Sequence, residues 1–319
     1  GNTIIYMAIR RPDGYCGKLA KLGTDVFAMD TGDGVAGIPD YDSNFPVDFA
    51  LARKPASGWN NEAHARLIGA KYLVTDGDNV EVSASQITWD SNVGWHNSGS
   101  NSDYQSWMWK RHAGFDVMTY TGNATARALP HSLNKIPEMI WVKDRNRDND
   151  WVVYHKGLNS GSNPEDKYLL LNEADAEADS TGMWNDTAPT STHFTIGSHG
   201  YVNEAPGGNG DKFIAMLFSS VSGISKVGYY TGSASGNTVT LGFQPRFVII
   251  KTANSGGAYM DWAVLDTTRG WGSGNDQRLH LNSVAAQNSQ DWGAPTSTGF
   301  TVSSGYHNNS DNVIYYAHA

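Results

Sequence analysis

The sequence predicts an all-β protein organised as three tandem β-sandwich repeats of about 100 residues each. Short aromatic or β-branched runs alternate with turns rich in Gly, Asn, Ser and Thr, a composition typical of β-proteins. An ordered set of landmarks recurs three times along the 319-residue chain. Apolar residues do not recur at helical spacing over three turns, so we expect few and short helices.

The repeat is the strongest pattern in the sequence. An Asn-x-Asp turn precedes a strand at Asp103, Asp211 and Asp311, at intervals of about 100 residues. Each interval also holds a proline before an apolar strand, then a second strand and a tryptophan. The matched prolines and tryptophans are Pro46, Pro137, Pro245, Trp89, Trp184 and Trp292. These landmarks place the first unit at residues 1–113, the second at residues 114–222 and the third at residues 223–319.

The first ten residues, GNTIIYMAIR, have the same pattern as the last ten, SDNVIYYAHA. We therefore interpret them as the closing strand of a preceding repeat, left without the front half of its unit. An unpaired edge strand of aromatic and β-branched residues promotes aggregation. We expect this orphan strand to pair within the first unit.

Within each unit the pattern predicts five to seven short strands. The runs MIWVK and FVIIK are continuously apolar, which predicts central strands buried on both faces. In YQSWMWKR the apolar residues alternate with polar ones, which predicts a half-exposed strand. The segment ADAEADS, from Ala174, suits a short helix or a solvated loop equally well.

Charge and composition exclude several classes of partner. The net charge is −9 without a basic run, which argues against nucleic acid. No apolar run approaches the roughly 20 residues that cross a bilayer, so we expect no membrane insertion. The single cysteine, Cys16, excludes an intrachain disulfide and is more often incidental than nucleophilic.

One segment resembles a calcium loop. In KDRNRDNDW, acidic or amide side chains stand at alternate positions from Asp144 to Asp150. The segment lacks the central glycine and the later bidentate glutamate of such loops, and the other two units carry no matching set. We favour a solvated hairpin turn over calcium binding, and we expect no metal site and no cofactor.

Aromatic residues in the last loop of each unit are the candidate ligand-binding residues. Trp95, Tyr201 and Tyr306 each stand among Asn, His and Gly. Such side chains hydrogen-bond a sugar while the ring stacks on its apolar face, and loops on a rigid scaffold often carry binding sites. The alternative is that the three rings only cap their sandwiches.

Catalytic motifs are missing from the sequence. It contains no HExxH, no GxSxG and no phosphate loop. His193 and His199 align with Gly299 and Gly305, so they do not belong to the common plan of the units. Paired carboxylates do not recur at matched positions either, which weakens a glycosidase interpretation. We therefore expect a protein that is not an enzyme.

The motifs YTGN, HSL, PEMIWVK, WVVYHK, YLLLN and APTS, in that order, closely resemble a repeated domain of marine bacteriophage structural proteins. The resemblance covers about residues 104–319 well and the first unit more loosely. It implies a jelly-roll or lectin-like sandwich in a tail, fibre or capsid-associated protein. It carries no catalytic residues over, because the family has no known function.

The leading hypothesis is therefore a non-enzymatic virion protein of a tail fibre, spike or capsid decoration, exposed on the particle surface. Its expected partners are other virion proteins and further copies of itself, with host surface glycan as an additional candidate. Two alternatives remain open. One is a carbohydrate-binding module that uses Trp95, Tyr201 and Tyr306, and the weaker one is a polysaccharide-degrading enzyme.

Overall fold

The computed structural model describes residues 20–34, 37–98, 100–205, 210–255 and 260–319. The predicted all-β class is confirmed, since about 40% of the chain is strand and 7% is helix. The strands form several antiparallel sheets, and none of these sheets closes into a barrel. The proposed orphan strand at residues 1–10 and Cys16 lie outside the described residues.

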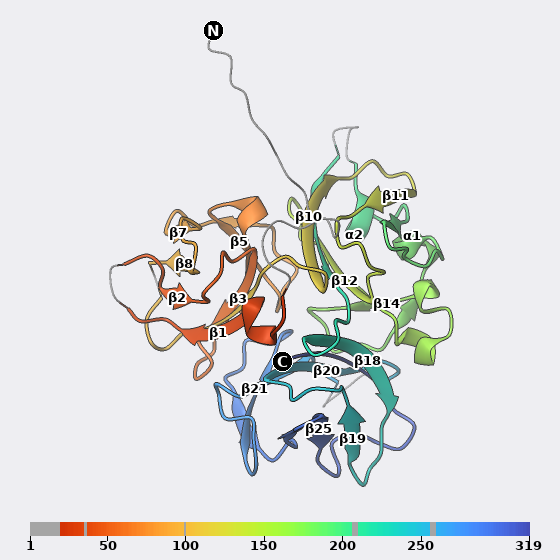
Figure 1. The fold of residues 1–319 in the computed structure, drawn as a ribbon. Helices are drawn as coiled ribbons and strands as arrows, with labels where there is room; N and C mark the ends of the chain where they lie inside the picture. The colour runs from red at the N-terminus through yellow and green to blue at the C-terminus, as the bar shows by residue number, and fades with distance from the viewer. Residues whose placement is uncertain (1–19, 35–36, 99, 206–209, 256–259) are drawn as a thin grey trace.

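Three six-stranded sheets dominate the molecule and surround a common centre, with the C-terminus close to it (Figure 1). Sheet 1 has the order β1 (Phe27–Thr31), β9 (Gln105–Trp109), β3 (Phe49–Arg53), β4 (Glu62–Ala65), β5 (Lys71–Val74), β6 (Val82–Ser83). Sheet 2 has the order β10 (Phe115–Thr121), β17 (Lys212–Phe218), β12 (Met139–Asp144), β13 (Val152–His155), β14 (Lys167–Leu170), β15 (Ala178–Asp179). Sheet 3 has the order β18 (Ser225–Thr231), β26 (Asn312–His318), β20 (Phe247–Thr252), β21 (Ala263–Asp266), β22 (Asp276–His280), β23 (Asn288–Gln290).

The three orders share one feature. In each sheet the strand that comes last along the chain lies second in the spatial order, beside the first strand. Thus β9 lies between β1 and β3, β17 between β10 and β12, and β26 between β18 and β20. The last strand therefore pairs on both sides, as β9 does with β1 and β3. The remaining four strands follow one another as antiparallel neighbours.

A smaller sheet packs on one face of each large sheet, which gives a sandwich-like layering. With sheet 1 lie β2 (Tyr41–Asp42), β8 (Gly94–Asn97) and β7 (Ile87–Thr88). With sheet 2 lie β11 (Arg127–Pro130) and β16 (His193–Ile196), beside α1 (Thr181–Trp184) and α2 (Gly200–Asn203). With sheet 3 lie β19 (Asn237–Thr240), β25 (Gly299–Val302) and β24 (Pro295–Thr296). Short 3-10 helices complete the described elements at η1 (Gly23–Asp25), η2 (Arg66–Ile68), η3 (Leu158–Gly161) and η4 (Pro164–Asp166).

The opposite faces of the three large sheets meet in a single apolar cluster. Aromatic pairs join each sheet to the next across this cluster, with ring centroids about 5 to 6 Å apart, a range in which such pairs add to plain burial. The pairs are Phe49 with Phe115 at 5.8 Å, Phe218 with Tyr316 at 4.9 Å and Phe27 with Phe247 at 5.1 Å. The three sheets therefore share one core in addition to their separate sandwich cores.

This shared core explains which strand predictions succeed. Strands β12 and β20 are buried along their whole length, as their continuous apolar runs predict. The prediction that YQSWMWKR is half-exposed is wrong, because every residue of β9 is buried. Trp107 and Trp109 face the shared core while Met108 faces the small sheet, so both sides of β9 are covered. The segment ADAEADS is a loop rather than a helix, and its residues Ala178 and Asp179 form the exposed strand β15.

Candidate functional site

Trp95, the candidate of the first unit, lies inside the protein. Its side chain is fully buried in β8, where its ring stacks on Tyr41 of β2 with centroids 5.0 Å apart. The indole Nε1 donates a hydrogen bond to the Ser106 hydroxyl at 3.1 Å. His64 and Trp89 pack on the same ring. In this conformation Trp95 has no free face on which a sugar could stack.

Tyr201 lies at the start of the short helix α2 and is half-buried. Its backbone N–H donates to Nδ1 of His199, and the two rings meet edge to face at 4.6 Å. Burial raises the pKa of the Tyr201 hydroxyl, and the nearby Asp150 carboxylate raises it further. The ring therefore keeps a partly exposed surface beside an acidic neighbour.

Tyr306 is also half-buried, and it packs edge-on against Trp292 with centroids 4.9 Å apart. The Arg278 guanidinium lies over the Trp292 ring at 3.5 Å and extends toward Tyr306. This arrangement is a cation–π stack that fixes the loop. Trp95, Tyr201 and Tyr306 pack on three different sandwich cores, so the structure does not bring them together into one site.

The Asp144–Asp150 segment forms a turn whose first carboxylate is already satisfied. Asp144 is fully buried and accepts hydrogen bonds from the Asn146 N–H at 2.8 Å and from Asn149 Nδ2 at 3.0 Å. Arg147 in the same turn pairs with Asp211 at 2.6 Å. Across the part of the chain that the structure describes, no three His, Cys, Asp or Glu side chains are grouped so that they could hold a metal. These contacts favour the turn interpretation over calcium binding.

The seams between the large sheets carry a set of matched hydrogen bonds. Trp151, just before β13, donates from Nε1 to the Val74 carbonyl of sheet 1 at 2.7 Å. Trp262, just before β21, donates to the Leu170 carbonyl of sheet 2 at 2.9 Å. Asn61, just before β4, donates from Nδ2 to the His280 carbonyl of sheet 3 at 2.9 Å.

The strand registers show that these three donors are equivalent. Each donor is followed directly by a residue that pairs with the central strand of its sheet, which is β3, β12 or β20. These following residues are Glu62, Val152 and Ala263. The three acceptors are equivalent too, because each pairs with one of those same three residues. Each sheet thus donates to the next in one direction, and the third bond closes the ring. Such head-to-tail contacts form a closed assembly only when the rotation between neighbours returns to its start.

A buried cation occupies the same register position of each central strand. These residues are Arg53, Lys143 and Lys251, all essentially without exposed surface. Burial lowers the pKa of Lys143 and of Lys251 to about 8 and that of Arg53 to about 10. Backbone carbonyls accept from each cation, as Asp144 and Arg147 do from Lys143 and as Met260 does from Lys251.

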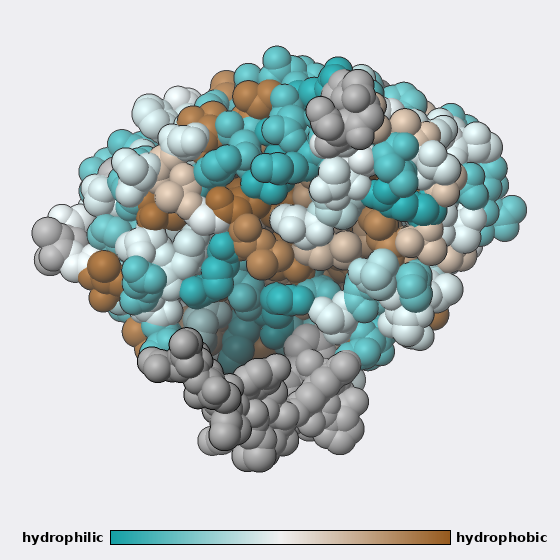
Figure 2. All heavy atoms as spheres, turned by 90° about the horizontal axis from the view of Figure 1, so that it is seen from above, coloured by the Kyte–Doolittle hydropathy of each residue, from teal (hydrophilic) through white to brown (hydrophobic). Residues whose placement is uncertain are grey.

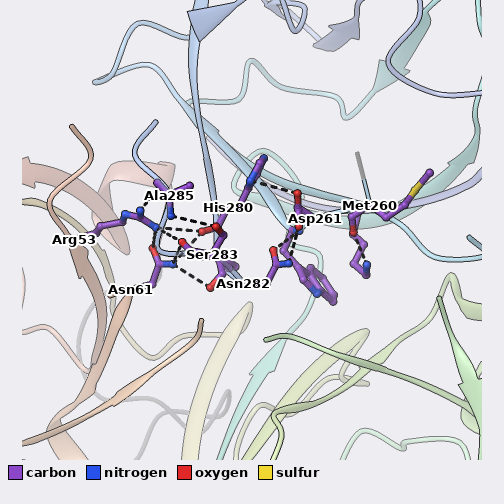
Figure 3. Close-up of polar contacts among 11 residues, drawn as sticks. Arg53, Asn61, Met260, Asp261, His280, Asn282, Ser283 and Ala285 are labelled. Carbon is purple, nitrogen blue, oxygen red and sulfur yellow. Dashed lines mark hydrogen bonds and ion pairs between the residues drawn. The ribbon is translucent and has the colours of Figure 1, made fainter. Parts of the chain in front are cut away.

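Arg53 differs because its carbonyl acceptors belong to the segment that follows β22 of sheet 3. Figure 3 shows Arg53 and Asn61 directed together at the backbone that follows β22. The Arg53 guanidinium donates to the Ser283 carbonyl at 2.6 Å, to the Ala285 carbonyl and to Asn61 Oδ1 at 2.9 Å. At this position the seam between sheets 1 and 3 is therefore polar, whereas an indole occupies the equivalent position of each of the other two seams.

The sequence patterns did not single out these seam residues as a group. Aligning the repeat places Asn61 opposite Trp151 and Trp262, but only the fold shows that this position faces a different sheet. One signal in the sequence could have found them. An Asp-Trp pair stands at Asp150-Trp151 and again at Asp261-Trp262, and Asn60-Asn61 stands at the corresponding place nearer the N-terminus.

Comparison with known proteins identifies a family. Residues 75–319 match DUF7483, described as a domain of unknown function. The chain belongs to the DUF7483 family. No curated protein matches it.

The DUF7483 region begins at Thr75, directly after β5, and includes all of sheets 2 and 3. Trp151 and Trp262 lie inside it together with their acceptor Leu170, whereas Arg53 and Asn61 lie before it. Both indole donors thus belong to the DUF7483 region. The hydrogen bonds of Arg53 and Asn61 to sheet 3 join that region to the segment that precedes it. Over the described residues, no helix is long and apolar enough to span a membrane.

Proposed function

We propose that the chain consists of three copies of one jelly-roll or lectin-like sandwich plan and serves as a non-enzymatic structural protein of a bacteriophage particle. The shared strand order, the equivalent seam bonds and the recurring sequence landmarks support the triplication. The likeness to phage structural proteins supports the setting on a virion surface, as part of a tail fibre, a spike or a capsid decoration.

The observation that carries this proposal is the shared core. Three sheets that bury their faces against one another form a rigid block, since protein interiors are close-packed and resist deformation. The loops of the small sheets lie on the outside of this block. Rigid blocks with outward loops suit a particle component that must keep its shape while it contacts partners.

Exposed apolar side chains support contacts with other virion proteins or with further copies of the chain. Figure 2 shows brown apolar patches bordered by hydrophilic residues on the face seen from above. Contiguous apolar surface of this kind often marks protein interaction sites. The large exposed apolar residues are Leu22, Ile38, Trp59, Leu67, Val80, Val82, Val93, Ile136, Tyr229 and Val284.

The test is the composition of purified particles. Phage particles whose genome encodes this chain are banded on a density gradient and analysed by mass spectrometry. We expect the chain in the particle band in fixed proportion to the major capsid protein. A soluble host protein of similar abundance serves as the control for carry-over. Absence of the chain from the particles would refute the proposed role.

Carbohydrate binding is the second candidate, because Tyr201 keeps a half-exposed ring next to His199 and Asp150. A glycan array tests it with the unmodified chain and with Tyr201→Ala. Loss of signal in the variant would support binding at this loop. A blank array for the unmodified chain would remove this candidate.

A further inference from the structure

A pocket of about 620 Å³ lies on the polar seam between sheets 1 and 3. Its sheet 1 side is formed by Lys54 and Ser57 after β3 and by Tyr104 and Gln105 at the start of β9. Its sheet 3 side includes Arg269, which follows β21. A volume of this size is within the range of about 300 to 1,000 Å³ that is usual for ligand sites.

The sheet 3 wall of the pocket is held in place by hydrogen bonds. Arg269 pairs with Asp266 at 2.6 Å, and its guanidinium also donates to the Val264 carbonyl at 3.1 Å and to Gln287 Oε1 at 3.3 Å. The Gln287 N–H donates to the Pro55 carbonyl at 2.7 Å, which ties this wall to sheet 1. The positive charge of Arg269 is therefore neutralised, and the wall is pre-formed.

The sheet 1 wall offers free polar groups beside aromatic rings. The Lys54 ammonium lies 4.8 Å from the Tyr104 ring centroid and 5.5 Å from that of Trp59, and within the described residues it has no carboxylate partner. Trp59 lies beside the pocket lining, next to Lys54, and its side chain is 45% exposed, so a ligand that extends past Lys54 can reach its ring. Asp103 also lines the pocket, and its charge balances that of Lys54.

Comparison of the three sheets shows that this wall departs from the common plan. Gln105 pairs with Arg53, and the corresponding pairs in the other sheets are Ile214 with Lys143 and Ile314 with Lys251. Gln105 thus stands where the other two sheets bury isoleucine. Its Nε2 donates to the Asp30 carbonyl at 3.0 Å and to the Ser106 carbonyl at 2.9 Å. Its Oε1 is buried and has no hydrogen-bond partner among the described residues, which is costly for a polar atom. The amide nitrogen therefore contributes to sheet 1, whereas the carbonyl oxygen is left as an unused acceptor at the pocket lining.

We infer that this pocket binds a segment of an uncharged saccharide. The hydroxyls of Ser57, Ser102 and Thr268 and the amide of Gln287 offer the donors and acceptors that sugar hydroxyl groups need. The open Trp59 ring beside Lys54 supplies a face for stacking, and the balanced charges favour a neutral ligand over an acidic one. This inference rests on the glycan contact of the proposed function and gives that contact a site.

The experiment uses the full chain and a panel of neutral cello-, malto-, manno- and galacto-oligosaccharides, with alginate and sulfated galactan fragments as acidic probes. Binding is measured by saturation-transfer NMR and by calorimetry. We expect at least one neutral probe to bind, and we expect Trp59→Ala to weaken it about tenfold or more, as for other anchoring aromatic residues. Ser57→Trp, which fills the pocket from an exposed position, abolishes binding.

Tyr201→Ala is the matched control, because it removes the half-buried aromatic candidate of the α2 loop and leaves the pocket intact. We expect it to bind the neutral probe as the unmodified chain does. Far-ultraviolet circular dichroism checks that each variant is folded. Because Trp59 and Ser57 are both exposed, their substitution leaves the core unchanged.

Three results would overturn the inference. They are the absence of binding to every neutral probe, binding to the acidic probes alone, and binding that is lost in Tyr201→Ala but kept in Ser57→Trp. The last result would show that the sugar binds at the α2 loop and not in this pocket, and it would leave the proposed glycan contact in place. None of the three affects the particle analysis, so the proposed structural role is judged separately.

Discussion

Single indole groups link the large sheets to one another. Trp151 is fully buried and donates from Nε1 to the Val74 carbonyl of the neighbouring sheet. Trp151→Phe leaves that carbonyl without its donor and removes part of the packed ring. We expect the free energy of unfolding to fall by about 1–3 kcal/mol, as when a buried polar group loses its partner.

Urea denaturation followed by circular dichroism measures this change. Trp59→Phe is the matched control, since the Trp59 ring is 45% exposed, and its effect is expected within about 0.5 kcal/mol. Equal midpoints for Trp151→Phe and Trp59→Phe would show that the seam bond does not contribute to stability.

His318 is the second residue with a measurable signature. Burial lowers the pKa of His318 well below its ordinary value near 6.5, so the folded protein keeps it neutral. The unfolded chain takes up a proton there when the pH falls below that value. Because the unfolded state then binds more protons, stability decreases as the pH falls from 7 to 5.

His318→Phe removes this titration, and Phe218 already occupies the equivalent position of sheet 2. We expect the urea midpoint of the variant to change less between pH 7 and pH 5 than that of the unmodified chain. His112 and His155, whose pKa values burial lowers to about 3, keep part of the dependence in both proteins. An identical pH dependence in both proteins would contradict this account of His318.

Recurring residues were easier to predict than the orientation of loop residues. The matched tryptophans Trp89, Trp184 and Trp292, which recur at corresponding places in the sequence, are all buried. Trp95 could not be placed from its sequence neighbours, because its stacking partner Tyr41 comes from a distant segment. A Gly-rich loop indicates a turn, but it does not indicate which side chain turns inward.

At the scale of elements, each central strand carries a buried cation at an equivalent position near its end. In β3 the Arg53 guanidinium satisfies the Ser283 and Ala285 carbonyls of sheet 3. Arg53→Met removes the donor to the Ala285 carbonyl and to the buried Asn61 Oδ1, and it leaves the Ser283 carbonyl with only Asn61 Nδ2 at 3.3 Å. We expect a loss of about 1–3 kcal/mol in unfolding free energy.

Arg53→Lys tests whether charge alone is sufficient, since Lys143 and Lys251 fill the equivalent positions. Lysine lacks the planar fork that reaches several acceptors at once, so we expect an intermediate loss. Lys212→Met, at an exposed position, is the control for removing a cation. If Arg53→Met is as stable as this control, the acceptors of the seam do not depend on Arg53.

The strands also show where periodicity fails as a guide to burial. The alternation in β9 correctly separates two faces, with Trp107 and Trp109 on one and Met108 on the other. It cannot tell that the face with Trp107 and Trp109 meets two other large sheets, or that the Met108 face meets a small sheet, so that neither face meets water. That information depends on contacts between units far apart in the sequence, and no local pattern records them.

The closed ring of sheets in the whole protein makes each large sheet depend on the other two. The aromatic pairs of the shared core and the three seam bonds join every sheet to both of its neighbours. Loss of one sheet exposes the inner faces of the other two. We therefore expect unfolding in one cooperative transition, without a stage in which a single sandwich has melted.

Trp262→Ala tests this coupling, because the substitution opens a cavity at the seam between sheets 2 and 3. Its cost is about 3–5 kcal/mol if the unit of unfolding is the whole chain. Hydrogen exchange then shows faster opening not only in β20 and β26 but equally in β3 and β9 of sheet 1. If exchange accelerates in sheet 3 alone, the sheets open independently, and the shared core is a contact surface between separate folding units.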